Sequence, residues 1–586
     1  MLYSPRTDEM LYVLTQVVHA ERRLHELPAH AEVDADLMAQ LMDEAGKFVA
    51  SEIAPLNRVG DETGARWSEG AVTMPPGFRD AYQAFWQAGW PALAAAPEDG
   101  GQGLPAVLEA MLFEMLSAAN HAWTMAPDLL HGAYDCLKAH GTQELKDRYL
   151  GKLATGEWLP TMCLTEPHAG SDLGLVSTRA VAQADGSYRI SGSKIFISSG
   201  EHDLSDNIVH LVLARLPDAP PGPKGLSLFL VPKFLPDGSR SAVHCERIEE
   251  KMGLHGSATC VMRFEAATGW LIGESGRGLN AMFVMMNSAR LHVALQGIGL
   301  LEAAWQKADE YSRERRQMRA PGRKAAQARA NAGAVSAADL IGEHPAMRRI
   351  LDSQRAWIDA GRVIAYRTAL ELDIAKQHPN AERREAAQRW CSLSTPILKA
   401  LFTQQAFHGG SECLQVFGGH GYVRESGIEQ HVRDARVTMI YEGSNEIQAI
   451  DLLVRKVLPD GALAFHLWLA ELGADLDPTV PAQAHLLARL TSLREHTQRL
   501  LQAATKDDTL AYWLAEDFLR AVGLTLVDWA WIQIARSSEA AAPRWSAPAQ
   551  AVQRWIMPEL SMRLAIIDTA LDPGSELAPG SIRGPG

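Results

Sequence analysis

One acidic residue late in the chain has neighbours suited to removing a proton. Glu442 lies between Tyr441 and Gly443, directly after an apolar run that begins at Val437. Apolar surroundings raise the pKa of a carboxyl group toward neutrality, where it is an effective general base, and glycine lets the backbone approach a ligand closely. A Glu-Gly pair alone is more often an ordinary loop with an acid at a helix end, so the surrounding residues must decide.

The segment around Glu442 adds to this pattern. Residues 415–448 read QVFGGHGYVRESGIEQHVRDARVTMIYEGSNEIQ, which is a glycine-rich turn, an amphipathic stretch and then the Glu-Gly pair. This order resembles the C-terminal motif of the acyl-CoA dehydrogenase family, Q-x-F-G-G-x-G-Y, then R-D, then I-Y-E-G-T-x-E-I-Q. The resemblance identifies the chain as a member of that family, or of relatives on the same fold with altered chemistry.

The resemblance implies roles for these motif residues. Glu442 is the base that removes the α-proton of an acyl-CoA thioester, and Gly443 lies against the substrate. The glutamine and the second glycine of the turn hold the adenosine half of FAD bound in the neighbouring subunit. The hydroxyl after Glu-Gly contacts FAD, here as serine in place of threonine. The implied cofactor residues are therefore Gln415, Gly419, Ser444 and Glu446.

Length and composition indicate a large protein of ordinary globular type. A chain of 586 residues is expected to form about three to five domains. Hydrophobic residues make up 47% and charged residues 22%, and the net charge of -14 disfavours nucleic acid as a partner. The six cysteines are far apart in sequence and form no C-x-x-C pair, so we expect a reducing compartment, the cytoplasm.

Two segments could be mistaken for a membrane or metal element. The apolar window from Phe518 to Ala535 contains Arg520 and Asp528, and the N-terminus MLYSPRTDEM has no apolar stretch behind basic residues, so we predict no membrane span. His19, His25 and His30 are close in sequence, but Pro28 interrupts any helix there, which argues against a shared metal face.

The first part of the chain is predicted to be helical. Residues 1–40 form an arm that begins with the apolar-rich DEMLYVLTQVV, and residues 41–159 form an N-terminal helical domain with apolar residues at three- and four-residue spacings. The glycine-rich segment PEDGGQGLP, residues 97–105, is either an interhelix turn or a ligand contact.

Residues 160–275 change to short β-rich runs, which predict a small β-domain. Its first loop, CLTEPHAGSDLG, offers backbone N–H groups at Gly170 and Ser171 that could cradle a flavin edge or a phosphate. The loop resembles the family motif C-x-T-E-P-x-A-G-S-D, which implies that Thr165 bonds the flavin pyrimidine and that Ser171 lies between the FAD phosphates and the CoA arm. The strand GSKIFISSG resembles another family segment, in which Phe196 packs on the flavin and Ser198 reaches its ring.

Residues 276–458 are predicted to form a helical bundle whose spine runs from MFVMMNSARL to YSRERR. By resemblance Arg290 lies near the acyl-CoA, and Asn287 replaces an aspartate that contacts CoA in some members. Some branches place the base directly before that arginine, but this chain has Ala289 there, which favours Glu442. Arg315 and Gln317 match the family's R-x-Q motif, whose arginine pairs with the pyrophosphate of the partner subunit's FAD.

The arginines around Arg315 leave an alternative open. Arginine recurs from residue 313 to residue 323, and Lys324 follows, so the run could be a solvated basic face or a nucleic-acid patch. The block APGRKAAQARANAGAVSAA that follows is aperiodic and is interpreted as a variable loop.

The remaining residues, 459–572, predict an additional helical domain, with residues 573–586 as a disordered tail. Apolar residues recur on helical faces in three runs, the last from Val552 to Leu571. This extension resembles the long branch of the family that includes the methylmercaptopropionyl-CoA dehydrogenases. The residues expected to be buried in the first two runs are Leu486, Leu490, Leu493, Leu500, Leu510, Trp513, Leu514 and Phe518.

The fold class implied is mainly α with a central β-barrel-like domain, that is, a helical bundle, a β-domain and a second bundle plus the extension. The activity implied is α,β-dehydrogenation of an acyl-CoA with FAD, with electrons passed to electron-transfer flavoprotein. No G-x-G-x-x-G opens a βαβ unit, so FAD is not held as in Rossmann proteins. It would lie between two subunits, with a homodimer expected. The alternatives are an acyl-CoA oxidase that uses oxygen and a DNA-associated relative with little dehydrogenase activity.

Overall fold

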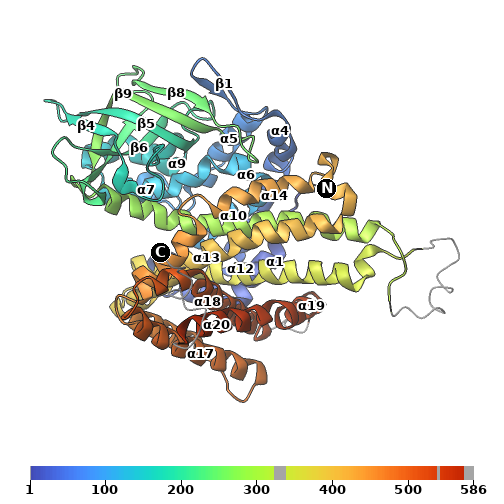
Figure 1. Cartoon of the computed structure of the whole chain (residues 1–586). Helices are drawn as coiled ribbons and strands as arrows, with labels where there is room; N and C mark the ends of the chain where they lie inside the picture. The colour runs from blue at the N-terminus through green and yellow to red at the C-terminus, as the bar shows by residue number, and fades with distance from the viewer. Residues whose placement is uncertain (1, 322–337, 538–541, 573–586) are drawn as a thin grey trace, which may run out of the picture. The chain divides into compact units, whose positions relative to one another are not determined.

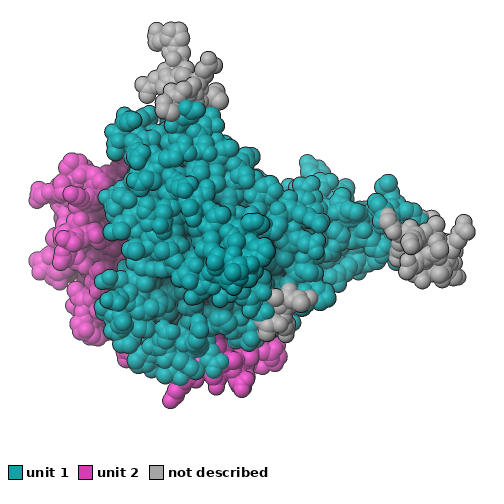
Figure 2. All heavy atoms as spheres, turned by 90° about the horizontal axis from the view of Figure 1, so that it is seen from below, with its two compact units in different colours: residues 1, 6–31, 294–586 teal, residues 2–5, 32–293 magenta. Residues whose placement is uncertain are grey.

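The computed structural model of the chain describes residues 2–321, 338–537 and 542–572 (Figure 1). The chain forms two compact units (Figure 2). Unit 1 contains residues 6–31 and 294–586, and unit 2 contains residues 2–5 and 32–293. The division falls within helix α10 (Gly278–Glu314), and each unit is described separately below. The interpreted loop at 320–338 and the tail at 573–586 lie almost wholly outside the described residues.

Unit 2 begins with helices, as the apolar spacing predicts. Asp34 starts the first of them, because its carboxylate accepts a hydrogen bond from the Leu37 N–H at 2.8 Å. The Asp99 carboxylate fixes the glycine-rich turn at residues 97–105, accepting from the Tyr134 hydroxyl at 2.7 Å and from Lys138 Nζ at 2.6 Å. The elements are α3 (Ala35–Phe48), α4 (Leu56–Thr63), β1 (Arg66–Ser68), β2 (Ala71–Thr73), α5 (Phe78–Gln87), α6 (Ala106–Thr124), α7 (Leu130–His140), α8 (Gln143–Leu145) and α9 (Gly151–Thr155).

The rest of unit 2 is a seven-stranded sheet in the order β3-β6-β4-β5-β9-β7, with β8 on β9. An additional pairing between β6 and β7 closes five of these strands into a barrel, which confirms the predicted barrel-like domain. Strand β7 is buried throughout and β6 nearly so, which explains their continuous apolar sequence. The strands are β3 (Leu159–Cys163), β4 (Arg179–Ala182), β5 (Tyr188–Ser198), β6 (Ile208–Arg215), β7 (Leu226–Pro232), β8 (Val243–Ile248) and β9 (Thr259–Ile272).

Among its described residues, unit 1 contains helices joined by loops and no β-strand. Three long helices, α10, α12 and α13, form its bundle (Figure 1). Helix α13 begins at Asn380, whose side chain accepts from the Glu382 and Arg383 N–H groups, and it continues through Pro396. The other bounds are α1 (Thr7–Tyr12), α2 (Ala20–Leu24), α12 (Pro345–Gln377), α13 (Ala381–Val416), α14 (Ile428–Arg436), α15 (Asn445–Ile450), α16 (Leu463–Gly473), α17 (Pro481–Ala504), α18 (Leu510–Ala535), α19 (Pro543–Ala551) and α20 (Met557–Leu571).

The C-terminal extension folds as a helical bundle on α12 and α13. All four predicted leucines of α17 are buried, which confirms that face. The prediction for Trp513 is wrong, since this side chain is 70% exposed. Leu510, Leu514 and Phe518 follow a four-residue spacing and form the inner stripe of α18, whereas Trp513 lies one residue off it.

Helix α18 is, in the described part of the chain, the one helix long and apolar enough to cross a membrane. Its apolar window is 89% buried within the fold, as in the core helix of a water-soluble domain. Two buried charged residues of the helix are paired: Arg520 contacts Glu559 at 2.7 Å, and Asp528 contacts Arg489. The apolar sequence of α18 is therefore explained by burial against neighbouring helices.

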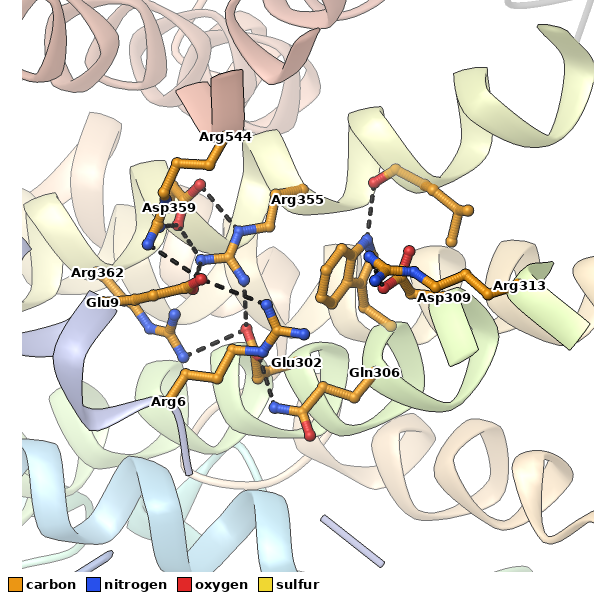
Figure 3. Close-up of polar contacts among 12 residues, drawn as sticks. Arg6, Glu9, Glu302, Gln306, Asp309, Arg313, Arg355, Asp359, Arg362 and Arg544 are labelled. Carbon is orange, nitrogen blue, oxygen red and sulfur yellow. Dashed lines mark hydrogen bonds and ion pairs between the residues drawn. The ribbon is translucent and has the colours of Figure 1, made fainter. Parts of the chain in front are cut away.

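A buried polar network joins the N-terminal arm and the extension to the bundle (Figure 3). Arg355 of α12 contacts Glu9 of α1, Glu302 of α10 and, at 2.8 Å, Asp359 of its own helix. Arg544 of α19 contacts Glu9 at 3.1 Å and Asp359 at 3.4 Å. Burial raises the pKa of Glu302, but the neighbouring arginines lower it to about 2. Residues far apart in the chain are thus joined by shared ion pairs.

Candidate active site

The loop that carries Glu442 connects α14 to α15 in unit 1, and its backbone is unusual. Glu442 has φ +55° and Gly443 has φ +81°, both in the left-handed region. A Cβ added at Gly443 would lie 2.8 Å from the Gln448 side-chain nitrogen, so the site requires glycine. A glutamate in this region costs about 1–3 kcal/mol and persists only where its surroundings enforce it.

A lysine that the sequence analysis missed holds this loop. Lys399, fully buried on α13, donates from Nζ to the Gly443 carbonyl at 2.8 Å and to Asn445 Oδ1 at 3.0 Å. Gln448 Nε2 donates to the Glu442 carbonyl at 3.0 Å. The signal in the sequence is one lysine in the apolar run PILKALF. Buried donors therefore fix both carbonyls of the Glu-Gly pair.

The apolar run before Glu442 does not enclose it as expected. Residues 437–439 form a single 3-10 turn, which points consecutive side chains in different directions. Ile440 is 55% exposed, and Glu442 itself is half-buried. Tyr441 instead points to α10, where its hydroxyl donates to Gln296 Oε1 at 2.5 Å.

Ser444 starts helix α15, where its hydroxyl accepts from the Ile447 N–H at 3.5 Å. A hydrogen bond from Ser444 is also the main cause that lowers the pKa of the exposed Glu446. This hydrogen bond therefore links Ser444 and Glu446, two of the predicted cofactor residues.

Four predicted FAD residues share one end of the bundle in unit 1. Tyr311 of α10 stacks on Phe417, with ring centroids 4.3 Å apart, and this contact places the end of α10 beside the glycine-rich turn. A Cβ added at Gly419 would meet no atom within 4 Å, so the turn is open to solvent. The exposed residues brought together there are Arg315, Gln317, Gln415 and Gly419.

Backbone hydrogen bonds between residues 315–317 and residues 339–341 hold Arg315 at the end of α10. Its carbonyl accepts from the Ile341 N–H at 2.8 Å, and the Gln317 N–H donates to the Asp339 carbonyl at 3.0 Å. Two of the neighbouring arginines are ion-paired: Arg313 pairs with Asp309 at 2.6 Å, and Arg319 pairs with Asp339 at 3.3 Å. Arg315 and Arg316 form no ion pair with any residue that the structure describes, and Arg316 donates to the Ala338 carbonyl at 3.5 Å. The guanidinium of Arg315 is therefore available to a phosphate, while residues 323 and 324 of the basic run lie outside the described part.

The predicted flavin loop, residues 163–172 of unit 2, is held by a buried glutamate. Glu166 accepts from the backbone N–H and the hydroxyl of Ser177 and of Thr178, at 2.6–3.0 Å, and from Lys194 Nζ at 2.8 Å. Lys194 also donates to the Leu164 carbonyl at 2.9 Å. Burial raises the pKa of Glu166, but Lys194 and these hydrogen bonds lower it to about 2. Glu166 and Lys194 lie inside the quoted motifs, yet the sequence analysis gave them no role.

A β-bulge presents Phe196 next to this loop. The register between β5 and β9 shifts between Lys194 and Ile197, and Phe196 has φ +58° with 60% of its side chain exposed. The Ile195 N–H donates to the Thr165 carbonyl at 2.9 Å, which joins the loop to the bulge. The predicted flavin residues brought together in unit 2 are Thr165, Gly170, Ser171, Phe196 and Ser198, of which Gly170, Ser171 and Phe196 are exposed.

The predicted acyl-CoA residues on α10 are only partly described. Arg290 is buried, and the side chain of Asn287 lies outside the described part. A buried cluster that the sequence analysis missed lies near Arg290, on α10, α6, α7 and the 3-10 turn at Pro127–Leu129. His292 Nδ1 lies 2.9 Å from Asp128 Oδ1, and His131 Nδ1 lies 3.1 Å from Glu109 Oε2. Among the described residues, no group of three or more His, Cys, Asp or Glu is placed to hold a metal ion.

Comparison with known proteins defines the class. The chain matches three descriptions: "Acyl-CoA dehydrogenase, N-terminal domain" over residues 37–157, "middle domain" over 161–267 and "C-terminal domain" over 325–457. The chain therefore belongs to the acyl-CoA dehydrogenase family of FAD-dependent oxidoreductases.

Individual relatives extend the likeness through the C-terminal helices. The chain is 41% identical over 515 residues to 3-methylmercaptopropionyl-CoA dehydrogenase of Ruegeria pomeroyi, covering 86% of each chain. It is 33% identical over 561 residues to a broad-specificity linear acyl-CoA dehydrogenase of Mycobacterium tuberculosis, covering 90% of this chain and 89% of the other. An acyl-CoA dehydrogenase of Bacillus anthracis complexed with FAD has the same fold, with a TM-score of 0.71 at 20% identity, covering 94% and 91% of the two chains.

The residues present fit FAD as the cofactor. The chain offers an exposed aromatic ring at Phe196 for the flavin and a guanidinium at Arg315 for a phosphate. The open turn at Gly419 leaves room for a ligand to lie against the backbone.

Proposed function

We propose that this enzyme converts an acyl-CoA thioester to the trans-2-enoyl-CoA, with Glu442 as the base that removes the α-proton. The observation that carries this assignment is the loop geometry: Glu442 is held in the left-handed region, and its carbonyl and that of Gly443 are fixed by Gln448 and Lys399. A backbone restrained in this way positions a carboxylate before substrate arrives. FAD, when bound, accepts the hydride that leaves Cβ.

The proton step needs support from the rest of the site. A thioester α-proton is far less acidic than a carboxylic acid, so the carbonyl must be polarised as enolate charge develops. We assign the main-chain N–H of Glu442 as one donor to that oxygen. Since the protein leaves Glu442 half-buried, the bound acyl chain must complete its desolvation and raise its pKa.

The position of the FAD-binding residues supports an oligomer. Arg315, Gln317, Gln415 and Gly419 form an exposed face at one end of the unit 1 bundle, where a second copy could bring the adenosine and pyrophosphate of its FAD. We place the enzyme in the cytoplasm as a homodimer, with electrons passing to electron-transfer flavoprotein. A tetramer that persists on dilution in light scattering would contradict the dimer.

For the substrate we propose a short linear acyl-CoA, with a thioether-containing acyl group among the candidates. The support is the identity to 3-methylmercaptopropionyl-CoA dehydrogenase, the first of the relatives described above. The test is to mix the FAD-loaded enzyme anaerobically with a panel of acyl-CoAs and to follow flavin bleaching. We expect fastest bleaching with butyryl-CoA and 3-methylmercaptopropionyl-CoA, and slower bleaching with chains of twelve or more carbons. The reverse order would contradict the substrate class.

The base is tested on the same panel with Glu442→Gln. The amide cannot accept the α-proton, so bleaching should slow by a factor of about 10⁴ or more while flavin binding is kept. Glu385→Gln, an exposed acid on α13, is the control and should bleach at the wild-type rate. Wild-type bleaching in Glu442→Gln would show that another residue is the base. Reduced enzyme that reoxidises in air within seconds, without electron-transfer flavoprotein, would indicate an oxidase.

A further inference from the structure

Unit 1 contains a cavity of about 370 Å³ that the proposed reaction does not use. Its walls come from α2, α12, α13, α16 and α18. Three of these helices, α2, α16 and α18, lie outside the sequence ranges matched by the family's domains. The residues that line it are Arg22, Arg23, Arg367, Glu371, Arg383, Ala386, Trp390, Glu471, Leu472, Asp475, Trp529, Gln533 and Arg536.

The charge in this cavity is unbalanced. Among the described residues that line it are five arginines, two glutamates and one aspartate, so guanidinium charges exceed carboxylate charges by two. The rim arginines, Arg22 and Arg536, form no ion pair with any described residue. Positive charge that is partly removed from water is costly unless an anion accompanies it.

Three of the arginines share one carboxylate. Glu371, 1% exposed at its side chain, contacts Arg367 at 2.6 Å and Arg23 at 3.7 Å, and Arg383 contacts both of its oxygens at 2.8 Å. Burial and the nearby Arg367 lower the pKa of Arg23 to about 9. The buried Nε of Arg367 has no hydrogen-bond partner among the described residues. The guanidinium groups therefore retain donors and charge that the described chain does not satisfy.

The cavity has walls of mixed character. Arg367 lies over the ring of Trp390, 5.0 Å from its centroid, and Trp390 packs against Trp529 with centroids 5.4 Å apart. Stacking on an indole fixes the plane of a guanidinium and leaves its donors pointing to one side. A volume of about 370 Å³ is at the low end of small-molecule sites, larger than a bare ion requires.

We propose that this cavity, the arginine pocket, binds a small dianion of the phosphate monoester class, separately from the FAD and acyl-CoA sites. The two excess positive charges match a dianion, and the fork of a guanidinium matches phosphate oxygens. The occupied pocket would join the N-terminal arm to the extension through a ligand, in addition to the ion pairs of Figure 3.

Thermal unfolding of the FAD-loaded enzyme tests the proposal, with inorganic phosphate as the probe at pH 7.5 and chloride as the ionic-strength control. Saturating phosphate should raise the Tm of the wild type by about 2–4 °C. The gain should disappear in Arg22→Gln/Arg536→Gln, which changes only exposed rim residues and should fold normally. Arg494→Gln/Arg554→Gln, a pair of exposed arginines outside the pocket, removes the same charge and should keep the gain.

A second variant separates an anion site from a structural salt bridge. Arg23→Met removes one of three arginines that share Glu371, but it also removes the hydrogen bond from Arg23 Nε to the Val18 carbonyl at 2.9 Å. Without phosphate its Tm should therefore lie close to that of the wild type, while the phosphate gain is lost. A structural role would instead lower the Tm equally in phosphate and in chloride. Succinate that matches phosphate would extend the class to dicarboxylates and contradict the preference for phosphate. No phosphate gain in the wild type, or an equal gain in the rim variant, would overturn the proposal.

Discussion

Two loops, one in each unit, carry the residues expected to do the chemistry, and a fully buried lysine fixes each of them. In unit 2, Lys194 Nζ holds the Leu164 carbonyl and Glu166 beside the flavin loop. In unit 1, Lys399 Nζ holds the Gly443 carbonyl and Asn445 beside Glu442. An ammonium group has three donors and no acceptor, so one buried lysine can fix a backbone carbonyl and a side chain together.

The two loops differ in what the lysine holds. Lys194 pairs with a carboxylate that four more donors saturate, and the loop backbone around it is reinforced by that ion pair. Lys399 holds a neutral carbonyl and a neutral amide, next to two residues with positive φ. The flavin loop is therefore stabilised by charge, whereas the catalytic loop is restrained in a strained backbone. Substitutions should affect stability most in the first loop and activity most in the second.

Replacing Lys194 should have the largest effect on stability. Lys194→Met leaves the buried Glu166 without its counter-ion, which costs about 3–5 kcal/mol in comparable buried pairs. Chemical denaturation followed by circular dichroism measures the loss. Lys152→Met, which breaks a half-exposed pair with Glu157 in the same unit, should cost less than about 1 kcal/mol. If both variants lose the same free energy of unfolding, the ion pair between Lys194 and Glu166 does not stabilise the flavin loop.

Replacing Lys399 should lower stability less and activity more. Lys399→Met removes a charged donor from the Gly443 carbonyl and from Asn445 Oδ1, which keep only the longer hydrogen bonds from Gln448 at 3.3 Å and Thr403 at 3.1 Å. This loss costs about 1–3 kcal/mol and releases the loop that positions Glu442. We expect kcat to fall about 10- to 100-fold with little change in KM, because the base is misplaced while the substrate still binds. Lys506→Met, which replaces an exposed lysine, should leave stability and kcat unchanged. A KM effect without a kcat effect would assign Lys399 to substrate binding instead.

Gly443→Ala should test the backbone strain directly. A Cβ at φ +81° costs about 1–2 kcal/mol, and it would also approach the Gln448 amide to 2.8 Å. Because the change lies next to Glu442, kcat should fall by more than the stability loss alone explains. Gly461→Ala is the matched control, because Gly461 also has a positive φ but a Cβ there would lie in open space. It measures the conformational cost of alanine at positive φ without the contact. If both variants keep full activity, the left-handed geometry at residues 442–443 has no catalytic importance.

Much of this arrangement could be predicted from the sequence, and the exceptions have physical reasons. Apolar spacing predicted α3, α5, α6 and the long α10, because each buries one face or all of its surface. Within the predicted β-domain, strand β8 has a weak apolar signal, because VHCERI buries only Val243 and Cys245 fully. Motif resemblance singled out Glu442 and Arg315, and the roles proposed for them are still predictions.

The supporting residues could not be predicted in the same way. Lys399 lies 43 residues before Glu442 in the sequence, and only the packing of α13 against the loop brings its amine to the Gly443 carbonyl. The arginine pocket combines residues from both ends of the chain, and no local pattern shows that Arg23, Arg367 and Arg383 share one carboxylate. Long-range polar contacts of this kind carry no periodic signal.

The smallest expected effect is one of pH, and it distinguishes the two loops most sharply. The pKa of Glu166 is about 2 in the folded protein and near its ordinary value of 4.5 in the unfolded chain. A depressed pKa gives stability that is fully present above about pH 4.5 and is lost as the pH falls toward 2. The Tm difference between wild type and Glu166→Gln should therefore narrow between pH 5 and pH 3.5, by the equivalent of about 1 kcal/mol. Asn445→Ala is the control, because it removes an amide oxygen, which does not titrate, from its contact with Lys399. The Tm difference between wild type and Asn445→Ala should stay constant over the same pH range.

If the Tm differences of the two variants have the same pH dependence, the flavin loop does not depend on an ionised Glu166. The contrast between the loops would then be one of geometry alone.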